Sequence, residues 1–188
     1  MSVRLVLSTL LLAAAPTAVL AQAMPEGFLC CNMRTDGKWI TDINYVDKSK
    51  RMLPVGTAAK VTSYGRNRVM VEVGGSTQTL GNDYSRNMQL DEFAQRYVVA
   101  ADPRIKINTF EPRIREAIKS ARLLPGMTRE QVLMSVGYPV STENPDLQAK
   151  VWRFWLDTSE EFQVVFDAAG IATEIGALPL SRPKILLN

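Results

Sequence analysis

The chain has 188 residues, a formal net charge of +3 and 46% hydrophobic residues, which suits one mid-sized domain or two small ones. The charge is too weak and too dispersed to favour a nucleic-acid partner. The sequence contains no histidine, so it lacks the commonest general base, the commonest metal ligand and any Ser-His or Cys-His nucleophile pair. We therefore expect a protein that is not an enzyme and that needs no cofactor and no metal.

The first 23 residues have the pattern of a secretory signal peptide. Arg4 supplies the positive start, an aliphatic stretch runs from Leu5 to Leu12, and small residues follow as far as Ala21 and Ala23, where two cleavage positions fit. The alternative is a transmembrane anchor, but Pro16 interrupts the apolar run, which falls short of the ~20 residues that a span needs. We expect an exported protein that resides in the periplasm or at the periplasmic face of the outer membrane.

The only cysteines, Cys30 and Cys31, are adjacent. Export favours oxidation, so they either close a small disulfide ring with each other or each pairs with another molecule. A lipid anchor would require small residues directly before Cys30, whereas Phe28 and Leu29 stand there, so we expect no lipid anchor. A soft metal site that combines both cysteines with Met33 lacks the further ligands of a closed site.

Residues 24–100 are expected to form a small all-β module that ends in a short helix over 90–98. Aliphatic and polar residues alternate in the expected strands, and Gly74-Gly75 is the signal of a two-residue hairpin. The Leu-Pro-Val-Gly-Thr entry at 53–57 and the closely spaced hairpins resemble those of an SH3-like barrel. The strands are predicted over residues 38–46, 58–63, 68–73 and 76–80.

Residues 101–177 change character and predict two helices followed by a three-stranded antiparallel meander. After a linker over 100–108, the first helix starts at Pro112, a residue that the first helical position tolerates. The second helix starts with a capping box made by Thr128 and Gln131. The strands are predicted over residues 151–157, 161–167 and 171–176.

A structural motif accompanies the second helix and the meander. Gly126 permits a turn, while Gly137 and Pro139 stop the helix. The motif comprises Gly126, Met127, Thr128, Gln131, Val132, Gly137, Pro139, Trp152 and Phe166. In this order it resembles the SmpA/OmlA (BamE-like) family, over residues 112–176. The chain departs from that family in having a β module ahead of the motif and no lipid-anchor signal before Cys30.

The resemblance implies an α+β fold: a small SH3-like all-β module followed by a BamE-like domain of two helices on a three-stranded antiparallel sheet. It also implies a binding protein without catalytic residues. Its partners would be envelope proteins such as the outer-membrane protein assembly machinery, with peripheral contact to anionic lipid. The alternative is a secreted inhibitor or ligand-binding module that regulates an envelope enzyme, which only analogy of fold supports.

One face of the meander is a candidate partner-binding surface. Side chains alternate across a strand, so Arg153, Trp155 and Val165 are expected on the face opposite Trp152 and Phe166. Tryptophan and arginine are enriched at the centres of protein interfaces. The alternative is that the N-terminal module or the tail, expected to be extended over 178–188, covers this face.

Overall fold

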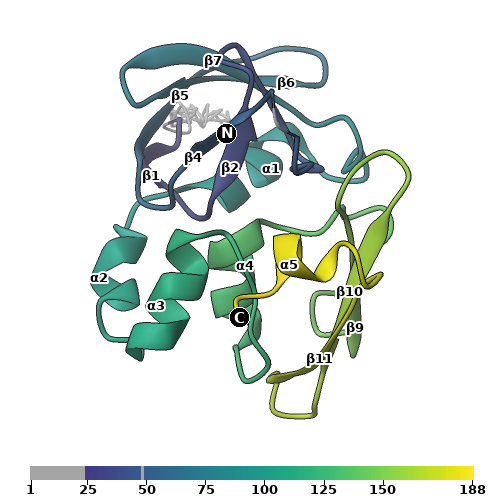
Figure 1. Cartoon of the computed structure of the whole chain (residues 1–188). Coiled ribbons are helices and arrows are strands. Elements are labelled where there is room, and N and C mark those ends of the chain that lie inside the picture. The colour runs from purple at the N-terminus through teal and green to yellow at the C-terminus, as the bar shows by residue number, and fades with distance from the viewer. Residues whose placement is uncertain (1–23, 48) are drawn as a thin grey trace, which may run out of the picture.

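The computed structural model of the chain describes residues 24–47 and 49–188, so the predicted signal peptide over residues 1–23 lies outside the described residues. The described chain is built on two sheets and short helices (Figure 1). The larger sheet and helix α1 form the upper part in that view, and the smaller sheet and helices α2 to α5 form the lower part. None of the helices in the described part is long and apolar enough to cross a membrane.

The larger sheet has eight strands in the order β4-β2-β3-β7-β6-β5-β1-β8. Its neighbouring strands are antiparallel except for β3 and β7, which run parallel. The strands are β1 (Glu26–Leu29), β2 (Met33–Thr35), β3 (Trp39–Thr41), β4 (Arg51–Leu53), β5 (Ala58–Tyr64), β6 (Arg68–Val73), β7 (Ser76–Gly81) and β8 (Val98–Val99).

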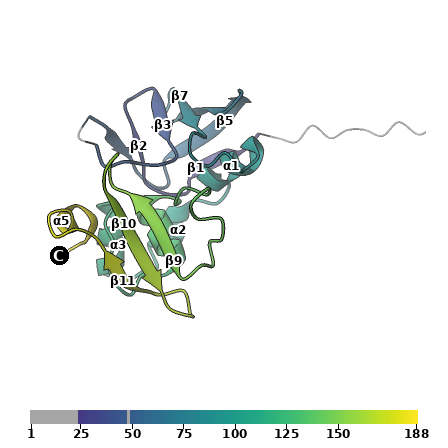
Figure 2. The same ribbon diagram turned by 90° about the vertical axis from the view of Figure 1, so that its right-hand side faces the viewer.

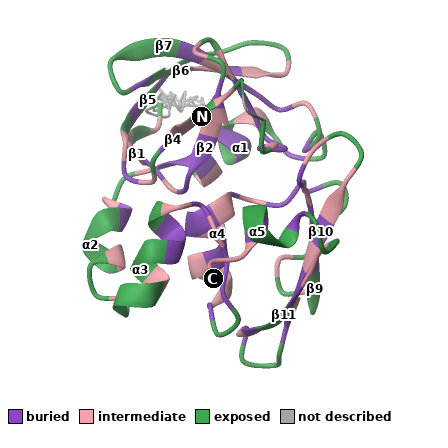
Figure 3. Cartoon of the chain, in the orientation of Figure 1, coloured by how far each residue is buried: buried purple, intermediate pink, exposed green. Residues whose placement is uncertain are grey.

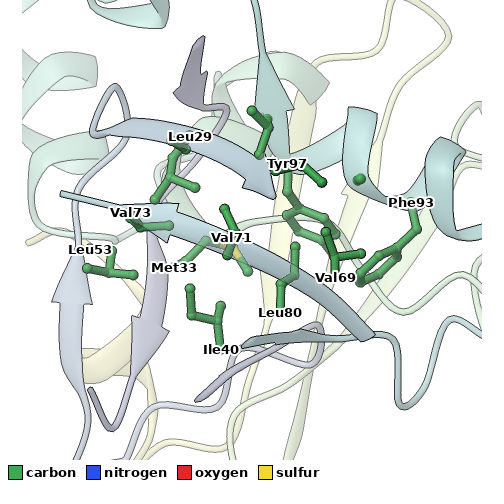
Figure 4. Packing of buried hydrophobic residues seen from close by; sticks show 14 of the residues in the cluster. Leu29, Met33, Ile40, Leu53, Val69, Val71, Val73, Leu80, Phe93 and Tyr97 are labelled. Atoms are coloured by element: carbon green, nitrogen blue, oxygen red, sulfur yellow. The ribbon is translucent and has the colours of Figure 1, made fainter. Parts of the chain in front are cut away.

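The first core forms where this sheet packs against helix α1 (Leu90–Tyr97). In β6 the buried residues are Val69, Val71 and Val73, which share one face because side chains alternate along a strand. Phe93 and Tyr97 from α1 meet that face, with their rings 5.0 Å apart in an edge-to-face arrangement (Figure 4). The alternation in β6 is the same pattern that the sequence predicts.

The smaller sheet has three antiparallel strands in the order β11-β10-β9, and helices cover one of its faces. The sheet lies in front of α2 and α3 in the view of Figure 2, and α5 lies beside it. These elements are α2 (Pro103–Ile107), α3 (Pro112–Lys119), α4 (Arg129–Val136), β9 (Val151–Trp155), β10 (Glu161–Phe166), β11 (Ala172–Gly176) and α5 (Arg182–Ile185).

The second core lies between this sheet and the helices. Trp152 and Phe166 are fully buried and their rings meet edge to face at 4.7 Å, while Phe154 and Phe162 are stacked at 5.0 Å. The Arg129 guanidinium lies 4.6 Å from the Phe166 ring and closes one side of the cluster. The purple strips along β9 and β10 in Figure 3 show how these residues alternate with more exposed ones.

The helix-end residues of the motif do what the sequence predicts. Thr128 accepts from the backbone of Gln131, whose side chain accepts from the backbone of Thr128 in return, so the capping box is confirmed. Gly137 ends α4 with φ at 87°, a left-handed conformation that favours glycine. A Cβ at Gly137 would also lie only 3.2 Å from the Asn44 amide nitrogen.

The predicted fold class is wrong. The chain does not form a small SH3-like barrel followed by a BamE-like domain of two helices on a sheet, but a mostly-sheet structure with an eight-stranded curled sheet and a three-stranded one. The residues from 24 to 32 lack the alternation of a strand, yet β1 pairs with both β5 and β8. The parallel pairing of β3 with β7 joins segments far apart in the chain, which hairpin signals do not reveal.

Three predicted ranges also need correction. The strand expected over 38–46 stops at Thr41, because the chain turns at Asn44, where φ is 54°. The expected linker over 100–108 contains α2, which Asp102 caps by accepting from the backbone of Arg104. The tail over 178–188 contains α5 instead of being extended throughout.

Two buried asparagines join the larger sheet to the helices. The Asn32 amide donates to the carbonyls of Ile118 (2.6 Å) and Ser135 (2.9 Å), and its oxygen accepts from the Val55 N–H (2.9 Å). The Asn44 amide donates to the carbonyl of Val136 at 2.8 Å. These carbonyls lie in the last turns of α3 and α4, where helices leave their acceptors unpaired.

The second core predicts the effect of removing its largest side chain. Trp152→Ala is expected to lower the free energy of unfolding by about 3–5 kcal/mol, because it opens a cavity among packed aromatic rings. Urea denaturation followed by circular dichroism measures the loss. The control is Val151→Ala at the neighbouring, exposed position, which is expected to stay within about 0.5 kcal/mol of the wild type. Equal losses for the two variants would contradict the observed strand register.

The hydrogen bonds of Asn32 and Asn44 to the helix ends, which we call the asparagine junction, make a second prediction. Asn32→Ala is expected to lower the free energy of unfolding by about 3 kcal/mol, because the carbonyls of Ile118 and Ser135 and the N–H of Val55 each lose a hydrogen bond to the Asn32 side chain. The same urea titration measures it. Asn108→Ala, at an exposed asparagine, is the matched control and is expected to change little. A loss for Asn32→Ala no larger than that of the control would show that the junction does not stabilise the fold.

Candidate functional site

The candidate site lies on the face of the three-stranded sheet that points away from the second core, which we call the outer face. Cross-strand pairing places Trp155 opposite Glu161 and Arg153 opposite Gln163. Val165, the third predicted residue, follows on the same side of β10 as Gln163, because side chains two apart share a face. The structure thus brings Arg153, Trp155 and Val165 onto one face, opposite the buried aromatic residues.

Neighbouring carboxylates hold Trp155 and Arg153 in place. The indole N–H of Trp155 donates to the Glu143 carboxylate at 3.0–3.1 Å, and Trp155 is half-buried. The Arg153 guanidinium forms an ion pair with Glu161 at 3.1 Å and lies 3.9 Å from Glu143. A large aromatic side chain that is already fixed loses little conformational freedom when a partner binds it.

The outer face carries more negative than positive charge. Glu143, Glu161 and Glu174 contribute carboxylates, and Glu174 is placed there by its pairing with Val165. Arg153 is the cation among them. A partner surface with an apolar centre and basic surroundings would complement this arrangement.

On the other side of β10 from Trp155, the outer face is open at the edge strand β11. A Cβ built on Gly176 would meet nothing within 4 Å, and Gly176 pairs with Gln163 of β10. A shallow groove of about 420 Å³ runs here, lined among others by Glu161, Gln163 and Leu178. Leu178, one of the residues that line this groove, is 62% exposed.

Sequence reasoning missed Glu143 and Leu178 as parts of this face. Glu143 lies in the irregular segment before β9, so no periodicity predicts where its side chain points. Leu178 has a weak signal, because it lies two residues beyond Gly176 and keeps the alternation of β11. Of the tail over 178–188, Leu178 lies at this face, whereas α5 lies beside the sheet in Figure 2.

Cys30 and Cys31 are joined to each other by a disulfide. Cys31 is fully buried in the first core and its sulfur lies 3.9 Å from that of Met33, whereas Cys30 is half-buried. Within residues 24–47 and 49–188, no three histidine, cysteine or carboxylate side chains gather as a metal ion would require. In the chain, the two bonded cysteines lie between the end of β1 at Leu29 and Asn32.

Asp42 is a buried carboxylate that the sequence did not single out. One of its oxygens accepts from the backbone N–H groups of Ser85 (2.7 Å) and Tyr84 (3.1 Å), while the other lacks a hydrogen-bond partner. Burial raises the pKa of the Asp42 carboxyl, and the two backbone hydrogen bonds offset this only in part. The carbonyl of Tyr84, whose N–H binds Asp42, accepts from the Thr142 hydroxyl. Asp42 therefore helps to fix a loop that connects the two parts of the chain.

The raised pKa of Asp42 predicts a pH dependence of stability. Because the folded state holds the Asp42 proton more tightly than the unfolded state, the contribution of this group to stability falls as the pH rises from the unfolded pKa, near 3.8, through the folded pKa. Asp42→Asn removes the ionisation and keeps an oxygen for both N–H groups. The free energy of unfolding of Asp42→Asn minus that of the wild type should therefore grow between about pH 3 and pH 7.

Asp36 provides a control of opposite sign. Hydrogen bonds from the backbone N–H groups of Lys38 and Trp39 lower the pKa of the exposed Asp36 carboxyl. Its contribution to stability is present above the unfolded pKa and is lost as the pH falls through the folded pKa. The free energy of unfolding of Asp36→Asn minus that of the wild type, from urea titrations across the same pH range, should therefore become more negative with rising pH. Two slopes of the same sign would contradict the assignment for Asp42.

The fold and the candidate site define the class of this protein: a mostly-sheet chain with a buried aromatic core and an acidic outer face that carries Trp155. No protein family, no curated protein and no solved structure matches this chain at a significant level. Its function is therefore inferred from its own residues.

Proposed function

We propose that this chain is a non-enzymatic binding protein of the cell envelope, which acts as a scaffold or accessory factor for other envelope proteins. The observation that carries the proposal is Trp155, which lies half-buried on the outer face with its indole N–H held by the Glu143 carboxylate. Tryptophan is enriched among the residues that anchor protein interfaces.

The chemistry of the outer face supports a protein partner. Its surface combines Trp155, Val165 and the exposed Leu178 with the carboxylates of Glu161 and Glu174. Interfaces of this kind have an apolar centre and a polar rim. The partner we propose is therefore a folded protein that presents an apolar patch surrounded by lysine or arginine.

Two features of the sequence support the envelope location and the assembly role. The signal-peptide pattern over residues 1–23 favours export. The string from Gly126 to Pro139 resembles the SmpA/OmlA family, whose members accompany outer-membrane protein assembly. The proposed partner class is accordingly the assembly machinery of the outer membrane.

A photo-crosslinking experiment tests the proposed function. A photoreactive amino acid is placed at Val165 on the outer face, and at Thr62 on β5 as a control at the opposite end of the molecule. After irradiation of intact envelopes, crosslinked proteins are identified by mass spectrometry. We expect outer-membrane assembly proteins to be captured from position 165 and not from position 62. Capture of none of them from position 165 would overturn the assembly role.

A substitution of the proposed anchor separates binding from folding. Trp155→Ala is expected to lower the free energy of unfolding by only about 1 kcal/mol, because the side chain is half-buried and loses a hydrogen bond to Glu143. It should weaken partner capture by about 2 kcal/mol, the loss typical of an interface anchor. The control is Tyr64→Ala, at a tyrosine of the other sheet that is 38% exposed. Unchanged capture for Trp155→Ala would move the partner site away from the outer face.

A further inference from the structure

A groove of about 590 Å³ lies between the loop after β4 and the helices α2 and α3, away from the outer face. Its floor is apolar and includes Val55, Ile107 and Ile118. The volume falls within the roughly 300–1,000 Å³ of sites that bind small molecules. The groove is therefore large enough to hold a small organic ligand.

One wall of the groove is basic. Arg104, Arg115 and Lys119 stand on it, and all three are exposed. Asp102 already neutralises Arg104 through a two-pronged pair at 2.7–2.9 Å. The Arg115 guanidinium donates to the backbone carbonyl of Asn108 at 3.2 Å, which leaves its charge uncompensated. Neither Arg115 nor Lys119 takes part in an ion pair within the described residues.

These two charges lie on the same side of α3. Arg115 and Lys119 are four residues apart in the helix, so their side chains are neighbours on its surface. The facing wall includes Met52 and Pro54, neither of which carries a charge. A ligand in the groove would meet two cations along one wall and apolar side chains along the floor and the other wall.

The asparagine junction keeps the groove in shape. Asn32 lines its base, and the same side chain binds the Val55 N–H at 2.9 Å and the Ile118 carbonyl at 2.6 Å. The two walls are thus connected through a buried side chain before any ligand arrives. A preformed site binds more tightly because fewer groups must be ordered on binding.

We propose that this groove binds an amphiphilic organic carboxylate. The carboxylate contacts the guanidinium of Arg115 and the ammonium of Lys119, and the apolar body lies on Val55, Ile107 and Ile118. Arginine presents paired N–H donors whose geometry matches a carboxylate. A neutral ligand of the same shape would forgo these charged hydrogen bonds, and a cationic one would be repelled.

The test compares three probes that share one apolar body: decanoate, decanol and decylamine. Decanoate and decylamine are titrated below their micelle-forming concentrations and decanol below its solubility limit into isotope-labelled protein, and amide NMR shifts report both affinity and location. We expect decanoate to shift the amides of Val55, Ile107 and Ile118, and to bind about tenfold more tightly than decanol. Decylamine should bind more weakly than both.

Charge variants locate the head group. Lys119→Glu is expected to weaken decanoate binding about tenfold, and Arg113→Glu, the same change at an exposed arginine on α3 outside the groove, should leave it unchanged. Equal binding of decanoate and decanol, equal effects of the two variants, shifts confined to other regions, or no binding at all would each overturn the proposal. Because the groove shares no residue with the outer face, its failure would leave the proposed partner-binding function untouched.

Discussion

The hydrogen bonds of Asn32 and Asn44 to the ends of two helices are the constraint on which the rest of the structure depends. A helix leaves its last carbonyls without partners inside the helix. In α4 the carbonyls of Met134, Ser135 and Val136 accept from the Asn32 backbone, the Asn32 side chain and the Asn44 side chain. The N–H dipoles of the two amides also face the negative end of the helix dipole, where positive charge is favourable.

This junction determines how the two cores relate to each other. Ser135 reinforces the junction, because its hydroxyl donates to the carbonyl of Arg122 at 2.6 Å and so connects α4 to the segment that follows α3. The larger sheet thereby contacts two helix ends at once through Asn32, which follows directly on the disulfide. A buried polar cluster that is satisfied in this way permits one packing arrangement and penalises others.

The two sides of the lower part differ in charge. The helices α2 and α3 present Arg115 and Lys119 beside the groove, and the outer face of the sheet presents Glu161 and Glu174 on the opposite side of the second core. Neither surface is continuous with the other, because the buried aromatic residues lie between them. One chain can therefore offer an acidic surface to a protein and a basic groove to a small anion without the two competing.

Local patterns predicted the local elements, and long-range pairing explains what they missed. The capping box at Thr128 and the alternation in β6 depend on residues close together in the chain, so the sequence reveals them. The alternation around Trp152 likewise predicted which face carries Arg153 and Trp155. By contrast, β1 is recognisable only through its pairing with β5 and β8, and Asn32 shows no sign in the sequence that it serves two helix ends. The wrong fold class follows from those non-local contacts.

The path of the chain into β2 explains how one segment contacts both the first core and the helices. Cys31 and Met33 are buried in the first core, while Asn32 between them points to the helix ends. A displacement of this segment would take the Asn32 amide away from the carbonyls of Ile118 and Ser135. It would leave a buried amide and helix carbonyls without these partners, an arrangement that is strongly unfavourable. Asn32 thus fixes the position of the segment that leads into β2, and through its bonds to Val55 and Ile118 it also holds the groove in shape.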